Sequence, residues 1–171
     1  MNFYELIKNR RSIRDYDPKK IVPDEVLGRI LDAGRIAPSA ANRQPRKFIV
    51  VKNPEVKQRL NECYNRLWFH DAPMVLVVVG YPDQAWQRAD KYNSIETDLT
   101  IAMDHMILAA EYEGVGTCWI AAFDNELLKD ALGLGHKEVV FAITPLGYPR
   151  EGYVKKEGPD RKALEEVIEI I

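Results

Sequence analysis

Three arginines and a serine lie within five residues near the start of the chain, and these residue types bind anions. The segment is Arg10-Arg11-Ser12-Ile13-Arg14. In an extended segment, side chains alternate between two faces, which puts Arg10, Ser12 and Arg14 on one face and Ile13 toward the core. Guanidinium groups and a hydroxyl at this spacing offer several donors to a phosphate. The alternative is an exposed basic turn, which is commoner for an arginine-rich pentamer taken alone.

A second group of hydrogen-bonding side chains lies in a loop between two prolines. Ser39, Asn42 and Gln44 fall in the segment bounded by Pro38 and Pro45. A proline stops the preceding helical pattern, and a proline at each end favours a defined loop. These side chains could read the polar edge of a ring or a polyol chain, and a capped turn would explain them nearly as well.

Hydrophobic periodicity predicts the elements that position these segments. Helices are predicted at residues 3–9, 23–36, 54–63, 93–113 and 125–132, and strands at 47–51, 74–79, 117–120 and 139–143. The strand at 74–79 is apolar throughout, which predicts burial on both faces. The longest helix is apolar almost all round in its second half, which predicts a central position. The alternation of strands and helices by itself favours a parallel sheet.

Composition excludes several classes of protein. The 171 residues include 24 basic and 26 acidic side chains, and without a basic tail the chain is not expected to bind nucleic acid. The start of the chain has no apolar leader, and the apolar run Met74–Val79 is too short to span a membrane. Cys63 and Cys118 have no metal-ligand spacing and suit a reducing compartment. We therefore predict one cytoplasmic domain without a metal site.

No self-contained catalytic set can be assembled from the sequence. The glycines of Gly114-Val115-Gly116 follow a helix and precede a predicted strand, which is the reverse of a dinucleotide-binding fingerprint. They are predicted to end the helix and turn the chain. The three histidines are far apart, and no Ser-His-Asp or Cys-His set is found. An anion-binding row without a catalytic set indicates chemistry supplied by a phosphate-bearing cofactor.

The C-terminal segment is polar and then apolar. Residues 150–160 are rich in Gly, Pro, Lys and Glu, and the chain ends with Val167-Ile168-Glu169-Ile170-Ile171. Apolar residues at the end of a polar arm need a surface that covers them. The arm can fold back or reach a partner subunit, and we predict that residues from about 150 to 171 clamp a partner.

Taken together, these segments resemble the nitroreductase family, the FMN-dependent NAD(P)H oxidoreductases. In chain order they are Arg10–Arg14, Ala37–Pro45, Asp71-Ala72-Pro73, Ala109-Ala110, Gly114–Ile120, Leu146–Pro149 and Arg161-Lys162. The resemblance implies an α+β three-layer sandwich formed by the single domain 1–171, with a mainly antiparallel, four-stranded central sheet flanked by helices. It also implies an obligate homodimer that exchanges its C-terminal strand and holds FMN at the subunit interface.

The resemblance assigns cofactor-binding residues by position. The FMN phosphate and ribityl chain are assigned to Arg10, Arg11 and Ser12, the phosphate also to Arg161, and the pyrimidine edge of the flavin to Arg14. The residues assigned from the opposite subunit are Pro38, Ser39, Ala40 and Asn42. Those assigned to the flavin ring are Asn65, Ile120, Ala121 and Ala122. No side chain is assigned a catalytic role, because N5 of the flavin carries the chemistry. Many relatives have glycine where this chain has Ala121 and Ala122, so the added methyl groups are expected to narrow the approach to the flavin.

The activity implied by the resemblance is a ping-pong reaction. NAD(P)H reduces the flavin and leaves, and a nitroaromatic, a quinone or a similar small acceptor then takes its place. The alternatives are other flavin chemistry on the same fold, such as enone reduction or reductive dehalogenation, a non-catalytic flavin carrier, and an anion-binding regulatory module. No residue that would read the ribose of the donor is identifiable, so the pattern does not choose between NADH and NADPH.

Overall fold

The chain folds around a three-stranded antiparallel sheet. The computed structural model describes residues 1–158 and 160–171, and Pro159, within the predicted arm, lies outside the described residues. The strand order is β1 (Arg46–Val51), β2 (Met74–Gly80) and β3 (Val139–Leu146). Both pairs are antiparallel, so the parallel sheet favoured by the alternation of strands and helices is wrong. The reason is that two helices between β1 and β2 return the chain to the end of the sheet where β1 stops, and Val51 pairs with Val75.

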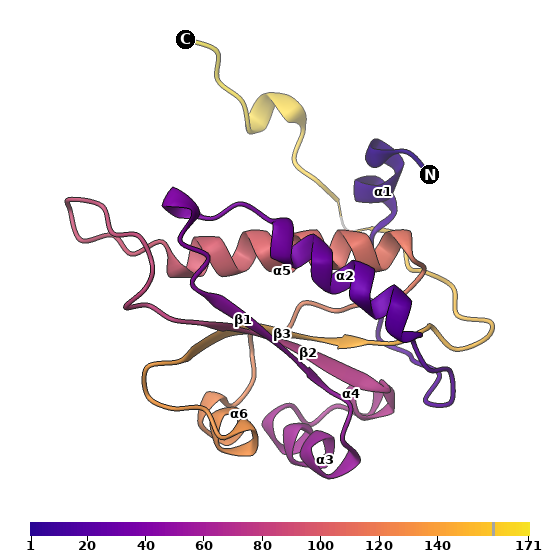
Figure 1. Ribbon diagram of the computed structural model, residues 1–171. Coiled ribbons are helices and arrows are strands. Elements are labelled where there is room, and N and C mark those ends of the chain that lie inside the picture. Colours follow the sequence, from indigo (N-terminus) through magenta and orange to yellow (C-terminus); the bar gives the residue numbers. More distant parts are fainter. Residues whose placement is uncertain (159) are drawn as a thin grey trace.

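Helices cover both faces of the sheet (Figure 1). On one face lie α2 (Asp24–Ile36) and α5 (Ile95–Tyr112), and on the other lie α3 (Pro54–Cys63), α4 (Leu67–Asp71) and α6 (Asn125–Leu132). The short helix α1 (Phe3–Asn9) lies outside the α2 and α5 layer. The predicted α+β three-layer sandwich is therefore confirmed. In the part of the chain that the structure describes, no helix has both the length and the apolar character needed to cross a membrane.

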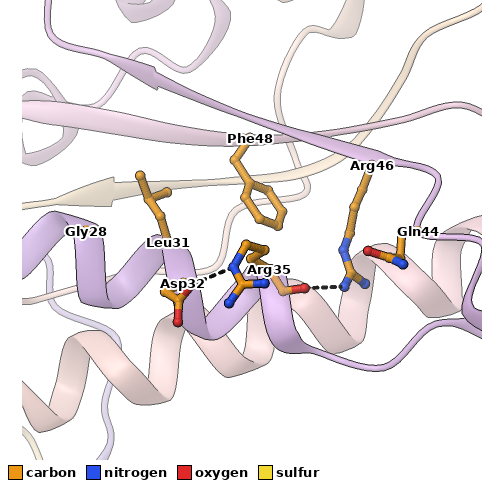
Figure 2. Close-up of a pocket in the computed structure, with 7 residues that line it drawn as sticks. All are labelled: Gly28, Leu31, Asp32, Arg35, Gln44, Arg46 and Phe48. Carbon is orange, nitrogen blue, oxygen red and sulfur yellow. Dashed lines mark hydrogen bonds and ion pairs between the residues drawn. The ribbon is translucent and has the colours of Figure 1, made fainter.

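The layer formed by α2 and α5 packs on the sheet and leaves a cavity beside α2. A cavity of about 450 Å³ lies between α2 and β1, lined by residues of both elements and of the loop before β1 (Figure 2). Elsewhere on α2, the guanidinium of Arg29 forms two hydrogen bonds with the carboxylate of Glu113, at 2.7 and 2.8 Å, which ties α2 to the end of α5.

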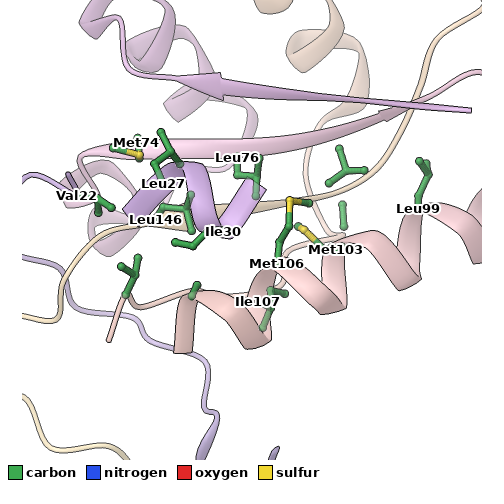
Figure 3. Close-up of a cluster of buried hydrophobic side chains, with 14 of the residues drawn as sticks. Val22, Leu27, Ile30, Met74, Leu76, Leu99, Met103, Met106, Ile107 and Leu146 are labelled. Carbon is green, nitrogen blue, oxygen red and sulfur yellow. The ribbon is translucent and has the colours of Figure 1, made fainter. Parts of the chain in front are cut away.

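Alternate residues of β2 build two separate cores. The even-numbered residues from Met74 to Val78 pack with α2 and α5, and the odd-numbered residues from Val75 to Val79 pack with α3, α4 and α6. Figure 3 shows the first of these cores, where side chains from β2, α2 and α5 meet. All residues of β2 are buried, so the predicted burial on both faces is confirmed.

Residues 117–120, predicted as a strand, do not form one. They make only isolated bridges, one to Ser12 and one to Ile143. The backbone amide of Cys118 donates to the side-chain hydroxyl of Thr144, at 3.0 Å, where a ladder would need a backbone carbonyl. The four-stranded sheet implied by the resemblance is thus corrected to three strands among the described residues.

Local signals in the sequence set several helix ends. The amide of Glu5 donates to the side chain of Asn2, and the amide of Asn2 donates to the carboxylate of Glu5, both at 2.9 Å, so α1 begins with a capping box as predicted. Gly114 follows α5 with φ of 73°, and Gly133 ends α6 with φ of 64°. This left-handed region suits glycine, and the predicted helix-ending role of both residues is confirmed.

The C-terminal arm leaves the body of the molecule (Figure 1). Its start is held by Arg150, which forms ion pairs with Asp15 at 3.0 Å and Asp71 at 2.9 Å. One short 3-10 turn follows at Leu164–Glu166. The aliphatic residues beyond it are exposed, with Ile170 92% accessible, and the clamp on a partner subunit stays a prediction.

Candidate functional site

A cavity of about 400 Å³ opens beside the segment Arg10–Arg14, which we call the arginine row. Its lining residues are Arg10, Arg11, Ser12, Arg14, Tyr153, Lys156, Glu157 and Arg161. The row and Arg161, which the sequence places at opposite ends of the chain, therefore meet in one place. Five cationic side chains face one carboxylate, so the cavity is strongly electropositive. Tyr153 and Lys156, which the sequence analysis did not single out, reach this cavity on the C-terminal arm.

The residue that points away from the cavity anchors the row. Ile13 is 1% exposed, as predicted, and its amide donates to the carbonyl of Thr117 at 2.8 Å. The buried Tyr16 hydroxyl donates to the carbonyl of Ile13 at 2.8 Å, and burial raises the pKa of this phenol well above its ordinary value. Gly116 leaves room for this packing, because a Cβ there would lie 3.0 Å from the Ile13 side chain. The backbone of the row is therefore fixed independently of any ligand.

Arg11 differs from its neighbours in the row. Its Nη1 donates to the carbonyls of Lys8 at 2.6 Å and Arg10 at 2.7 Å, both at the end of α1. The arm passes close by at Gly158, where a Cβ would lie 2.6 Å from Nη2 of Arg11. Arg11 thus caps α1 and lies against the arm while it lines the cavity.

Arg10 and Arg14 are available to an anion. Across residues 1–158 and 160–171, neither guanidinium forms an ion pair with a carboxylate. The guanidinium carbon of Arg14 lies 6.0 Å from the ring centroid of Trp68. Behind the row, burial raises the pKa of the Cys118 thiol, and the positive charge of Arg14 offsets part of this rise. Cys118 is 2% exposed and packs in the core, as predicted.

The second predicted segment, Pro38–Asn42, lies at the other end of the helical layer (Figure 1). The amide of Ala40 donates to the carboxylate of Asp98 at 2.8 Å, in the first turn of α5, whereas the arginine row is bonded to Thr117 beyond the end of this helix. From Asp98 to Tyr112 the helix rises roughly 20 Å. Within one chain, the structure does not bring this segment together with the arginine row.

The loop that contains this segment has an unusual backbone. Ala41, Asn42 and Gln44 have φ of 50°, 53° and 52°, in the left-handed region that non-glycine residues seldom adopt. The hydroxyl of Ser39 accepts from the amide of Gln44 at 2.9 Å, and the side chain of Gln44 donates to that of Asn42 at 3.1 Å. Ser39 and Gln44 therefore shape the loop, and the exposed Asn42 is left at its surface.

Asp98 supports this loop and was not identified from the sequence. The residue is 1% exposed, and its second carboxylate oxygen accepts from the hydroxyl of Ser94 at 2.9 Å. A signal was present, because Asp98 falls three residues after Ile95 and on the helix face that is buried. An acid on an apolar helix face indicates a specific buried partner.

Arg46 holds the start of the loop, where α2 ends. Its guanidinium donates to the carbonyls of Arg35 at 3.2 Å and Pro38 at 3.3 Å, and also to that of Ala37. Figure 2 shows the bond to Arg35. Burial lowers the pKa of Arg46, and the nearby Asp98 carboxylate acts in the opposite direction.

The residues predicted at the flavin ring are separate from the electropositive cavity. Asn65 and the pair Ala121-Ala122 are exposed, and none of them lines that cavity. The amide of Asp124 donates to the carbonyl of Cys63 at 2.9 Å, which brings the segment after Ala122 beside the end of α3, near Asn65. Ile120 is 4% exposed and packs in the core with α3 and α6, so its side chain is not available to a ligand.

Comparison with known proteins assigns the chain to a family. The sequence profile of the Nitroreductase family matches residues 7–68 and 61–148. The chain belongs to the nitroreductase family. The predicted membership is therefore confirmed, and the matched ranges include the arginine row and the loop after α2.

The matches to related proteins and to solved structures cover most of the chain. A nitroreductase-family relative from Archaeoglobus fulgidus, whose name pairs NADH dehydrogenase with NAD(P)H nitroreductase, is 33% identical over 92% of this chain and 91% of its own. Iodotyrosine deiodinase 1 of Rattus norvegicus is 26% identical over 97% of this chain and 68% of its own. A nitroreductase family protein from Clostridium difficile 630 has a TM-score of 0.89 at 32% identity, covering 99% of this chain and 98% of that one. An FMN-dependent nitroreductase from Clostridium difficile R20291 has a TM-score of 0.81 at 26% identity, covering 98% of each chain.

Proposed function

We propose that this chain is an FMN-dependent NAD(P)H oxidoreductase that reduces a small acceptor such as a nitroaromatic or a quinone. One observation carries the proposal: the arginine row and Arg161 line a single electropositive cavity in a chain of the nitroreductase family. The relative named for NAD(P)H nitroreductase activity and the structure named as FMN-dependent support the same cofactor and donor for this chain.

The donor set of the cavity suits the phosphate of FMN. Arg10, Arg11, Ser12 and Arg161 supply guanidinium and hydroxyl donors, the groups that bind phosphate oxygens through charge-assisted hydrogen bonds. Five cations around one cavity repel one another, and a phosphate dianion would relieve that repulsion. A phosphate group therefore fits the residues present.

The protein's part in the reaction would be to bind the cofactor, to orient it and to favour its reduced form. The chemistry that bound FMN supplies is acceptance of a hydride at N5 and its transfer to the acceptor. Arg10, Arg11 and Ser12 would hold the phosphate end, and Arg14 would place a positive charge at the pyrimidine edge, where it favours the reduced form. The anchoring of Ile13 in the core keeps these donors in place before any ligand arrives.

We also propose that the active form is a homodimer with a cofactor at each of two shared sites. Support comes from the distance between the arginine row and the loop Pro38–Asn42, which leaves that loop to complete the site of a second copy. Exposed apolar side chains on α1 and α5, such as Phe3 and Tyr112, line a groove that a second copy could cover. The arm at 150–171 would clamp the partner, since its aliphatic end is exposed in the single chain.

The two cysteines support a reducing compartment such as the cytoplasm. Cys63 and Cys118 are both free thiols, and both are buried. Burial raises the pKa of each thiol, so both stay protonated and unreactive in the folded chain.

Reductive dehalogenation of an aromatic ring is a second candidate activity. It is supported by the likeness to iodotyrosine deiodinase 1, which extends over 97% of this chain. The two candidates share the cofactor and differ in the acceptor. A panel that holds nitroaromatics, quinones and halogenated phenols separates them.

The decisive experiment is the visible absorption spectrum of the purified protein, before and after anaerobic addition of NADH and then NADPH. A yellow protein that bleaches, and recovers with one acceptor of the panel, supports the proposal and identifies the donor. A yellow protein that neither donor reduces indicates a flavin carrier. A colourless protein that also fails to bind added FMN refutes the proposal.

A further inference from the structure

We propose that Asp98 and Arg46 are positioning residues that hold the loop Pro38–Gln44 in the shape in which it meets the FMN of a partner subunit. The inference rests on the proposed function and deepens it, because it names the groups that prepare the half of the site contributed by the second copy.

The loop needs external support. Ala41, Asn42 and Gln44 all have φ between 50° and 53°, although none is glycine. Such backbone is unfavourable for side chains with a Cβ and persists only when the surrounding structure determines it. Strained segments of this kind gather at ligand sites.

Asp98 supplies support for the middle of the loop. Its carboxylate is almost fully buried and accepts from the amide of Ala40 at 2.8 Å and from the hydroxyl of Ser94 at 2.9 Å. A buried carboxylate is unfavourable unless its oxygens accept hydrogen bonds, so the side chain of Asp98 and the backbone of the loop stabilise each other. Ala40 is the residue directly before the three strained positions begin.

Arg46 supplies support for the start of the loop. Its guanidinium donates to three carbonyls at and just beyond the end of α2, those of Arg35, Ala37 and Pro38. Arg46 and Asp98 belong to the same chain as the loop, so the loop is formed before a second copy or a cofactor arrives. A preformed loop lowers the entropy lost on binding, which predicts tighter FMN binding.

The first test compares the FMN dissociation constants of apoprotein dimers by fluorescence titration. For Asp98→Ala and Arg46→Ala we expect the constant to rise at least tenfold, which corresponds to about 1.4 kcal/mol. The matched controls are Asp104→Ala, an exposed acid on the same helix, and Arg59→Ala, a surface arginine bonded to Asp130, and both should stay within twofold of wild type. Equal constants for wild type and both loop-support variants overturn the proposal.

A coupling test separates positioning from general loss of structure. The second variant replaces residues 39–42 by glycine (Ser39→Gly, Ala40→Gly, Ala41→Gly and Asn42→Gly), which removes the side chains of the loop and leaves its backbone free. If Asp98 acts through the loop, Asp98→Ala should change the FMN constant by less than twofold in this background. A full additional loss there, or a glycine variant that binds as wild type does, overturns the proposal. The fold-changes in the FMN dissociation constant caused by Arg10→Ala and by Asp98→Ala should multiply, since the proposal assigns Arg10 and the loop that Asp98 supports to different subunits of the site.

Failure of the inference is distinguishable from failure of the proposed function. A wild-type protein that does not bind FMN refutes the proposed function, whereas wild-type binding with unaffected variants refutes only the positioning role. If Asp98→Ala does not fold, Arg46→Ala and the glycine variant decide the outcome by the same two criteria. Sedimentation of each variant establishes that dimers are being compared.

Discussion

The amide of Ile13 donates to the carbonyl of Thr117 at 2.8 Å, and this bond joins the arginine row to the segment that follows α5. The same segment continues into Ala121-Ala122, which the family resemblance assigns to the flavin ring. The phosphate end and the ring end of the proposed site are therefore built on one backbone connection. A disturbance at this junction should affect both.

Gly116→Ala tests the junction between these two segments. The new Cβ would lie 3.0 Å from the Ile13 side chain, so we expect a loss of about 1–3 kcal/mol in the free energy of unfolding and weaker FMN binding. Urea unfolding and FMN titration measure the two effects. Gly28→Ala is the matched control, because a Cβ there meets nothing within 4 Å. Equal losses in both variants would contradict the prediction.

Arg10→Ala should weaken the retention of FMN. The guanidinium lines the electropositive cavity and has no carboxylate partner among the described residues, so a phosphate is its expected partner. A hydrogen bond to a charged group contributes about 1.5–3 kcal/mol, which predicts roughly a tenfold to hundredfold rise in the dissociation constant. Fluorescence titration against Arg59→Ala as control measures it. Unchanged affinity would remove Arg10 from the phosphate site.

Arg14→Ala should make the midpoint potential of the bound flavin more negative. A positive charge at the pyrimidine edge favours the reduced form, and its loss should lower the potential by tens of millivolts, where 30 mV in a two-electron couple corresponds to about 1.4 kcal/mol. Anaerobic equilibration with a reference dye measures the potential. Arg14→Lys keeps the charge and should retain most of the wild-type value. A midpoint that does not change in Arg14→Ala excludes this role.

Removal of residues 167–171 should weaken the dimer. The segment carries Val167, Ile168, Ile170 and Ile171, all at least half exposed in the single chain. Burial of one large aliphatic side chain contributes about 1.5–3 kcal/mol, so the dimer dissociation constant should rise at least tenfold. Analytical ultracentrifugation over a dilution series measures it, with Glu165→Ala in the same arm as control. An unchanged constant would mean that the arm does not clamp the partner.

The free energy of unfolding should fall between about pH 9 and pH 11. Burial raises the pKa of Cys63 from 9.0 to about 11, so the unfolded thiol ionises before the folded one. The stabilisation is present in full below pH 9 and is lost as the pH rises through the folded pKa. Urea unfolding at pH 8, 9 and 10 measures the slope, which Cys63→Ala should reduce. The Cys118 thiol acts in the same direction and remains in that variant.

Signals confined to a few neighbouring residues predicted most elements correctly. The capping box of Asn2 and Glu5, the helix stop at Gly133 and the unbroken apolar run of β2 each depend on local sterics or periodicity. The alternation of strands and helices by itself favoured parallel strands, whereas the antiparallel sheet implied by the family resemblance is confirmed. Strand direction depends on where α3 and α4 return the chain. The pairing of Val51 with Val75 is a property of the folded chain.

The residues of the candidate site also differ in whether neighbouring residues in the sequence identify them. The arginine row could be identified as an anion-binding segment because its donors are adjacent in the sequence. Asp98 is bonded to an amide 58 residues away, and Thr144 interrupts the predicted strand at 117–120 from 26 residues away. The position of Asp98 on the apolar face of its helix indicates that it has a buried partner, but periodicity does not identify a partner at such a separation.

The residue types and the segments of the proposed site can be identified from residue order alone, and these segments carried the family membership. How the segments lie in space depends on the folded chain. Folding brought Arg161 to the arginine row, and it put the loop Pro38–Asn42 at the far end of α5. The physical reason is that helix length and the packing of α2 against α5 set distances of tens of ångströms, while residue order sets only which groups are available.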